Sequence, residues 1–116
     1  MENKDCIFCR IIAGKIPSDI IYQDEEVIAF RDINPQAPVH LLVIPRKHYA
    51  SLVELPDKET PLLGHMISVA RQLASDEGIS EIGYRLVINC GEQGGQLIPH
   101  LHIHVMGGRH LSGQLG

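Results

Sequence analysis

The segment from His100 to Val105 constrains the fold more than any other part of the chain, because histidine and an aliphatic residue alternate along it without interruption. Successive side chains of a β-strand point to opposite faces of the sheet. The segment therefore predicts a strand over His100–Met106 with three histidines on one face and leucine, isoleucine and valine on the other. We expect the aliphatic face to pack against a helix, which leaves the histidine face for water or a ligand.

Other segments predict the elements around this strand. Apolar residues at helical spacing predict a long helix with Thr60 as its N-cap and Pro61 in its first position, ended by Gly78. A short helix is expected over Cys6–Ala13, with Asp5 as its cap. Four further strands are expected at Ile20–Gln23, Val27–Asp32, His40–Ile44 and Tyr84–Cys90. This order indicates an α+β fold with a five-stranded, mainly antiparallel sheet, one long helix and one short helix.

Composition excludes several classes of function. A net charge of −4 provides no positive field for nucleic acid or an anionic membrane. The polar N-terminus and the short apolar runs predict neither a signal peptide nor a membrane span. Three cysteines are an odd number, which argues against a disulfide framework and favours a reducing cytoplasm. A length of 116 residues fits a single domain over 1–116, whose apolar surface a second copy of the chain would cover.

Three interpretations of the histidine face remain open from the residues alone. The face could be the polar side of an amphipathic strand, or its His-x-His pairs could be metal ligands. Alternatively, one neutral imidazole could attack phosphorus while a neighbour protonates the leaving group. The turn before the strand favours this last interpretation, because Gly94 and Gly95 allow backbone N–H groups to approach a phosphate closely. The sequence contains neither a P-loop nor a dinucleotide-binding glycine motif.

Several segments resemble the histidine triad superfamily, and in particular its Hint branch of nucleotide-binding phosphoramidases. Residues 100–106 are similar to the motif His-φ-His-φ-His-φ-φ, in which φ is hydrophobic. The likeness continues through residues 7–12, 30–38, 40–45 and 94–96. It implies the HIT-like fold, a homodimer, and cleavage at the α-phosphorus of purine nucleotides of the adenosine phosphoramidate type through a covalent nucleotidyl-histidine. Dinucleoside polyphosphate hydrolysis, metal-dependent hydrolysis and nucleotide binding without turnover are the alternatives.

The resemblance also implies roles for individual residues. His102 would attack the α-phosphorus, oriented by the backbone carbonyl of His100. His104 would contact the phosphate and the leaving group, and His40 would support the triad. Asp32 would hold the ribose hydroxyls. The remaining nucleotide contacts would come from Ile7, Phe8, Ile11, Phe30, Ile33, Asn89, Gly95, Gln96 and Leu97.

The phase of one strand supports part of this assignment independently. Phe30 and Asp32 fall on the same face of the strand expected at Val27–Asp32. An aromatic ring suits a purine, and a carboxylate suits a ribose diol. Taken alone, however, Phe30 is also compatible with the core, and Asp32 with a residue that caps the following Asn-Pro loop.

Cys6 and Cys9 form a C-x-x-C pair at the start of the short helix. A zinc half-site is favoured over a redox pair, since no strand precedes the motif. Some histidine triad proteins and the related uridylyltransferases join such a pair with two histidines, which implies His48 and His100 as the other ligands of a closed, structural zinc. No catalytic cofactor is expected. Two reduced cysteines are the alternative, and Cys90 is expected to be a core residue.

Leu97 departs from the family pattern, because the Hint branch often has a serine at this position. The serine hydroxyl is thought to assist the departing amine, and leucine has no hydrogen-bond donor in its side chain. The resemblance is therefore weaker on the leaving-group side of the site than on the nucleotide side.

Overall fold

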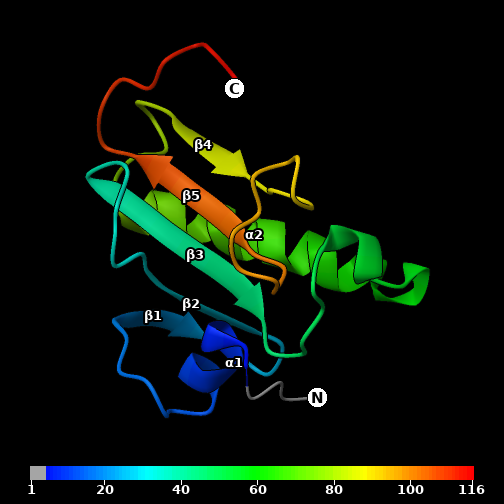
Figure 1. Cartoon of the computed structure of the whole chain (residues 1–116). Coiled ribbons are helices and arrows are strands. Elements are labelled where there is room, and N and C mark those ends of the chain that lie inside the picture. Colours follow the sequence, from blue (N-terminus) through cyan, green and yellow to red (C-terminus); the bar gives the residue numbers. More distant parts are fainter. Residues whose placement is uncertain (1–4) are drawn as a thin grey trace.

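The computed structural model describes residues 5–116, which form one antiparallel sheet between a long and a short helix (Figure 1). The helices are α1 (Ile7–Ile12) and α2 (Thr60–Asp76), and short 3-10 turns at Leu52–Glu54 and Asp57–Glu59 lead into α2. The strands are β1 (Ile20–Gln23), β2 (Val27–Arg31), β3 (Val39–Pro45), β4 (Tyr84–Val87) and β5 (Ile103–Gly107), in the spatial order β1-β2-β3-β5-β4. The expected α+β fold with a five-stranded antiparallel sheet is confirmed.

The central strands are buried on both faces, because the two helices cover opposite sides of the sheet. Val27 and Ala29 of β2 belong to the apolar cluster that contains α2. Ile28 and Phe30 alternate with them and belong to the cluster that contains α1. This double cover explains why residues 27–30 of β2 are all apolar, since a stretch buried on both faces of a sheet has no polar side.

The aliphatic side of the histidine segment packs as expected. Leu101, Ile103 and Val105 are at most 1% exposed, and they share a cluster with Met66 and Ala70 of α2. Full burial of each such side chain stabilises the fold by about 2 kcal/mol. The long helix and the histidine segment are therefore held together by this layer of the core.

The residues that cap the two helices differ from the predicted ones, because local hydrogen bonds determine where each helix begins. The Sγ atom of Cys6, rather than Asp5, caps α1 by accepting from the backbone N–H of Cys9 at 3.3 Å. Glu59 is the N-cap of α2, and Thr60 is its first residue, because the Thr60 hydroxyl donates to the preceding turn instead of capping the helix. Over residues 5–116, no helix is long and apolar enough to cross a membrane.

The histidine strand starts later than its alternating pattern predicts. β5 runs over Ile103–Gly107 rather than over His100–Met106. The backbone N–H of Leu101 donates to the carbonyl of Tyr49 at 2.7 Å, so the chain is still bound to a loop at this point rather than to a neighbouring strand. The other corrections to strand ends are Arg31 in place of Asp32 for β2, Val39–Pro45 in place of His40–Ile44 for β3, and Val87 in place of Cys90 for β4.

Candidate active site

His102 is buried against α1, with one ring nitrogen fixed by the backbone. Its Nδ1 lies 2.6 Å from the carbonyl oxygen of His100, so Nδ1 carries the hydrogen and donates it, which leaves a lone pair on Nε2. The ring of Phe8 packs edge-on against it at 5.3 Å between centroids, and His102 is only 5% exposed. The histidine face, which the sequence leaves for water or a ligand, is thus largely covered by α1 at this residue. Burial lowers the pKa of His102, although the His100 carbonyl and Asp32 oppose the shift, so the ring is neutral at pH 7.

His104 pairs with His40 on the adjacent strand β3. Nδ1 of His104 lies 2.9 Å from Nε2 of His40, and the backbone N–H of Gln36 donates to Nδ1 of His40 at 3.0 Å. Burial is the main reason that the pKa of His104 falls to about 4, and the neighbouring rings of His102 and His40 add to the shift. Burial also lowers the pKa of His40, against the effect of Asp32. At pH 7 His104 is thus a neutral hydrogen-bond donor rather than an imidazolium ready to protonate a leaving group.

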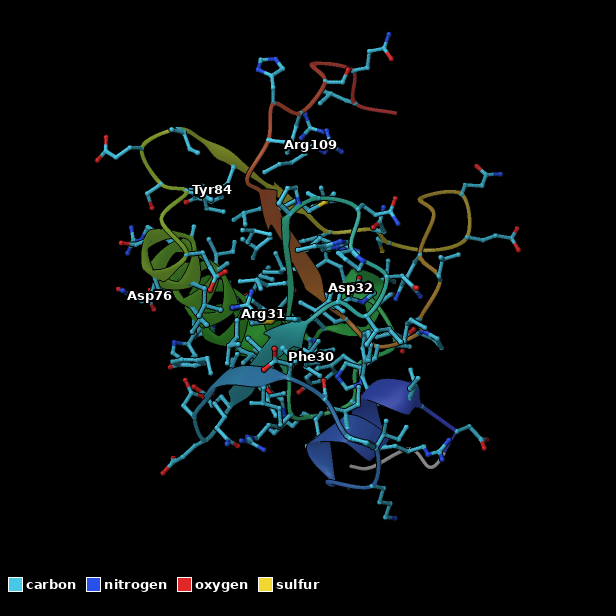
Figure 2. The ribbon with its side chains drawn as sticks, turned by 90° about the vertical axis from the view of Figure 1, so that its left-hand side faces the viewer. Phe30, Arg31, Asp32, Asp76, Tyr84 and Arg109 are labelled. Carbon is cyan, nitrogen blue, oxygen red and sulfur yellow. The ribbon has the colours of Figure 1, made fainter. Side chains whose placement is uncertain are left out.

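Asp32 follows the end of β2 beside the histidine pair (Figure 2). Its Oδ1 accepts from the backbone N–H of Asn34 at 2.8 Å, which is the turn-capping contact that the sequence offers as one alternative. Its Oδ2 lies 3.4 Å from Nε2 of His40. One carboxylate therefore both shapes the Asn-Pro loop and places negative charge beside the histidines.

The glycine turn before the histidine segment is held by its own hydrogen bonds. The backbone N–H groups of Gly94, Gly95 and Gln96 all donate to carbonyls within the turn. A Cβ atom on Gly94 would lie 2.4 Å from the Cys90 carbonyl oxygen, so glycine is required there by the turn itself. In this structure the turn is therefore folded on itself, and its glycines have a structural reason independent of phosphate.

Gln96 and Asn89 support this turn with their side chains. The amide group of Gln96 donates to the carbonyls of Ala50 and Ile98 at 2.7 and 2.9 Å and accepts from the backbone N–H of Gly91. Asn89 donates to the Gly94 carbonyl at 2.8 Å. The resemblance implies both residues as nucleotide contacts, and in the structure each stabilises the loop.

The apolar residues that the resemblance implies as nucleotide contacts fall into two groups. Phe8, Ile11 and Phe30 are buried in one cluster, where the two aromatic rings meet edge to face at 5.5 Å. Ile33 and Leu97 are 82% and 89% exposed, and Ile7 is 39% exposed. The structure therefore places the first three in the core, as the alternative for Phe30 states, and leaves the others available to a ligand.

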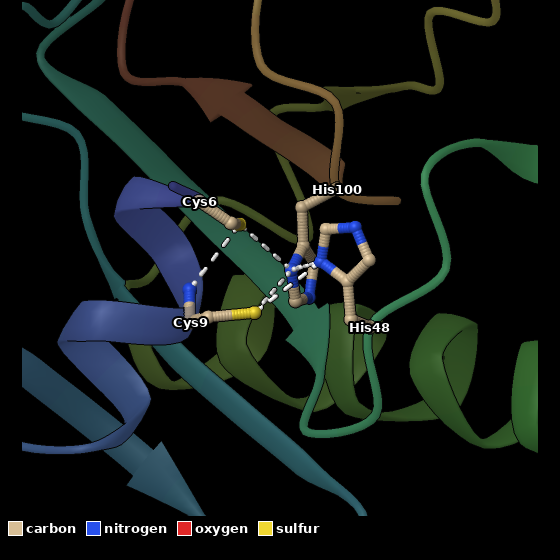
Figure 3. A group of neighbouring side chains, drawn as sticks. All are labelled: Cys6, Cys9, His48 and His100. Atoms are coloured by element: carbon tan, nitrogen blue, oxygen red, sulfur yellow. Dashed lines mark hydrogen bonds between the residues drawn. The ribbon is translucent and has the colours of Figure 1, made fainter. Parts of the chain in front are cut away.

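A compact group of sulfur and nitrogen donors joins α1 to the start of the histidine segment (Figure 3). Nδ1 of His100 lies 3.2 Å from Nδ1 of His48 and 3.3 and 3.6 Å from the sulfurs of Cys6 and Cys9. Nδ1 of His48 lies 3.3 Å from the Cys9 sulfur. A tetrahedral zinc with ordinary bond lengths separates its ligand atoms by about 3.4 to 3.7 Å. These four residues could therefore hold one metal ion.

The ring of His100 is oriented for this group by the backbone. Its Nε2 donates to the Pro45 carbonyl at 2.9 Å, so the Nδ1 lone pair faces the sulfurs. Burial lowers the pKa of His100 to about 4, so this nitrogen is free of a proton at pH 7. Within residues 5–116, His100 groups with the cysteines, whereas His104 groups with His40 and Asp32. A metal bound by the triad alone would require the three histidines to converge on one point. The separate groups show that they do not.

Comparison with known proteins decides the family. A family model described as scavenger mRNA decapping enzyme C-term binding matches residues 5–116. Purine nucleoside phosphoramidase of Escherichia coli strain K12 is 47% identical over 112 residues, which cover 97% of this chain and 94% of that protein. The structure of a histidine triad protein from Clostridium difficile matches with a TM-score of 0.95 and 46% identity, covering 99% of this chain and 100% of that one. The chain belongs to the histidine triad family. A histidine triad nucleotide-binding protein from Candida albicans also matches, at 29% identity and a TM-score of 0.79, covering 96% and 86% of the two chains.

Two backbone groups that contact the histidines of this histidine triad protein cannot be predicted from its sequence. The backbone N–H of Gln36 contacts His40, and the backbone carbonyl of Pro45 contacts His100. Nearly every residue has a backbone N–H and a carbonyl, so the sequence does not show which of them will contact a side chain. The only available signal is the Asn-Pro loop, which predicts a rigid backbone beside His40.

Proposed function

We propose that this protein is a nucleotidyl-transferring hydrolase that cleaves purine nucleotides of the adenosine phosphoramidate type at the α-phosphorus. The observation that carries the proposal is the neutral ring of His102, whose Nδ1–H is tied to the His100 carbonyl while Nε2 keeps its lone pair. The 47% identity to a purine nucleoside phosphoramidase over nearly the whole chain supports the substrate class.

In the proposed reaction, Nε2 of His102 forms a bond to the α-phosphorus as the bond between phosphorus and the leaving amine breaks. The amine departs after taking up one proton from the solvent. Water then attacks the phosphorus of the nucleotidyl-histidine. Its oxygen stays on the nucleoside monophosphate, one proton returns to the solvent, and the bond between phosphorus and Nε2 breaks, which restores the neutral ring. His104 would bind a phosphate oxygen, and Asp32 would hold the ribose hydroxyls. Exposed Ile33 and Ile7 would contact the base.

We further propose that Cys6, Cys9, His48 and His100 bind one structural zinc. Two sulfurs and two nitrogens at near-tetrahedral separations are a donor set typical of zinc. Burial raises the pKa of the Cys6 thiol, so a bound cation would stabilise the thiolate form there. Four protein ligands leave no open position, so the ion would fix α1 to the histidine segment and take no part in the reaction. Cysteines that form no disulfide and can bind a metal suit the reducing cytoplasm.

A homodimer is proposed on the basis of the family resemblance and the sheet edges. β1 and β4 form the two edges of the sheet, and an unpaired edge strand is a site for pairing with another chain. Ile67 and Ile82 are 44% and 78% exposed and would gain from cover by a second copy. A symmetric dimer in which the sheets join or lie edge to edge satisfies both features.

Trapping of the covalent intermediate tests the proposed reaction. The protein is mixed with adenosine phosphoramidate labelled at the phosphorus, quenched within one turnover and analysed for adenylated protein. We expect label on His102 in the wild type and none in His102→Ala. His110→Ala is the matched control, because His110 is an exposed histidine in the tail, and it should keep the label. Turnover without any labelled histidine would refute the covalent route, and tight binding without turnover would favour a nucleotide-binding module.

A further inference from the structure

A line of hydrogen bonds runs from the backbone of the Asn-Pro loop to His104. The N–H of Gln36 donates to Nδ1 of His40 at 3.0 Å, and Nε2 of His40 lies 2.9 Å from Nδ1 of His104. A backbone N–H can only donate, so Nδ1 of His40 must accept and carries no hydrogen. The neutral ring of His40 therefore has its hydrogen on Nε2.

The state of His104 follows from the same rule. Because Nε2–H of His40 donates, Nδ1 of His104 must accept, and the neutral ring of His104 carries its hydrogen on Nε2. His102 has the opposite arrangement, since its Nδ1–H donates to the His100 carbonyl. The two rings lie next to each other, with centroids 4.9 Å apart. Adjacent imidazoles in one site are thus held as different tautomers.

We propose that the backbone amide of Gln36, acting through His40, is a positioning device that fixes His104 as the Nε2–H tautomer. His102 then offers a lone pair on Nε2, while His104 offers an N–H on Nε2, without either ring being protonated. An anionic phosphate needs both, because the nucleophile must attack phosphorus and a donor must stabilise the oxygens. With the other tautomer, the Nε2 lone pair of His104 would repel the phosphate. The assigned tautomers belong to the free protein, and only their use toward phosphate rests on the proposed function.

No competing acceptor near His40 in the described part of the chain changes the assignment of its Nε2–H as the donor to His104. Asp32 is the charged group that faces His40, and its Oδ2 lies 3.4 Å from Nε2 of His40, beyond the range of a good hydrogen bond. Nδ1 of His104 is closer, at 2.9 Å, and takes the hydrogen. A doubly protonated His104 would point its Nδ1–H at the Nε2–H of His40, and two facing N–H groups repel each other. The lowered pKa values of His40 and His104 agree with neutral rings.

The loop that carries Gln36 is held from both sides. Asp32 binds the N–H of Asn34, and the guanidinium of Arg109 donates to the Gln36 carbonyl at 2.9 Å from the tail beyond β5 (Figure 2). A Cβ atom on Gly108 would lie only 3.0 Å from the Cβ of Pro38, so the tail packs closely on this loop. The donor that starts the line is therefore fixed in space rather than free to turn away.

Nitrogen NMR tests the tautomers directly. Long-range ¹H–¹⁵N spectra of histidine-labelled protein at pH 7 show which ring nitrogen lacks a hydrogen, and they need no substrate. We expect His40 and His104 as Nε2–H tautomers and His102 as the Nδ1–H tautomer. A His104 ring with its hydrogen on Nδ1, or averaged shifts for its two nitrogens, would overturn the inference. A failure of the proposed reaction leaves this result unaffected, so the two can be told apart.

Matched variants test the origin of the effect. Gln36→Pro removes the N–H donor, whereas Gln36→Ala keeps it, so only the proline variant should change the His40 and His104 spectra. Equal spectra for both variants would contradict the proposal.

Variants of His40 provide a second test that does not depend on the loop. The amide group of glutamine in His40→Gln can still donate to Nδ1 of His104, but His40→Leu has no donor. We expect kcat for adenosine phosphoramidate to fall about three- to tenfold in His40→Leu, with little change in KM, and to recover in His40→Gln. Equal losses in the two variants would show that His40 acts only through packing.

Discussion

Replacing Leu97 with serine should speed the release of poor leaving groups. Leu97 lies between the glycine turn and His100 and is 89% exposed, so the substitution removes no core contact. Exposed substitutions of this kind usually change the free energy of unfolding by less than about 0.5 kcal/mol. A change in rate in Leu97→Ser would therefore report on the site rather than on unfolding.

The expected size of the effect follows from the state of His104. Its pKa of about 4 leaves it neutral at pH 7, so it rarely supplies a proton to the departing amine. In the proposed site, a serine hydroxyl at position 97 would add a donor on the leaving-group side. One hydrogen bond of this kind is worth about 1–3 kcal/mol in the transition state, which corresponds to a gain of about five- to hundredfold in rate.

A leaving-group series separates this effect from a simple loss of bulk. kcat/KM is measured for adenosine phosphoramidates with amines of increasing basicity, in the wild type, Leu97→Ser and Leu97→Ala. The alanine variant removes the apolar side chain without adding a donor. We expect the gain in Leu97→Ser to grow with amine basicity and to exceed that in Leu97→Ala. A constant ratio across the series, or equal gains in both variants, would refute the reasoning.

Four further outcomes are expected. His102→Ala should lose several orders of magnitude in turnover while nucleotide affinity, measured by calorimetry, stays within about tenfold; a residual rate above a few per cent would exclude the covalent mechanism. Elemental analysis should find one zinc per chain, and Cys6→Ser should lower the melting temperature more than the activity; zinc-free wild-type protein would contradict the metal site. Light scattering at micromolar concentration should give a dimer, and a monomer would rule out the proposed assembly. Because the folded pKa of His104 lies below that of an unfolded histidine, the unfolded state binds more protons between pH 6.5 and 4. As the pH falls through this range, the free energy of unfolding should decrease, and His104 should account for at most about 3 kcal/mol of the decrease. Urea unfolding at several pH values measures this. An unchanged free energy of unfolding would contradict the burial of His104 as a neutral ring.

Sequence patterns predicted those features that depend on periodicity. The alternation of Leu101, Ile103 and Val105 correctly placed one side of the segment against α2, because the two faces of an extended chain are set by its geometry alone. The start of β5 was not predictable in this way. An alternating pattern cannot tell whether the backbone N–H of Leu101 bonds to a strand or to the Tyr49 carbonyl in a loop.

For the candidate site, the sequence by itself determined the kinds of chemical groups and their spacing: three histidines in alternation, a C-x-x-C pair and an acid at the end of a strand. Only the tertiary structure decided how they are divided, with His100 joining the cysteines and His48 while His104 joins His40. It also decided that these rings are neutral, because burial depends on what covers a residue and not on the residue itself. The ring hydrogens of His40, His100 and His102 are placed by a carbonyl or an N–H of the backbone, and these positions exist only once the chain has folded.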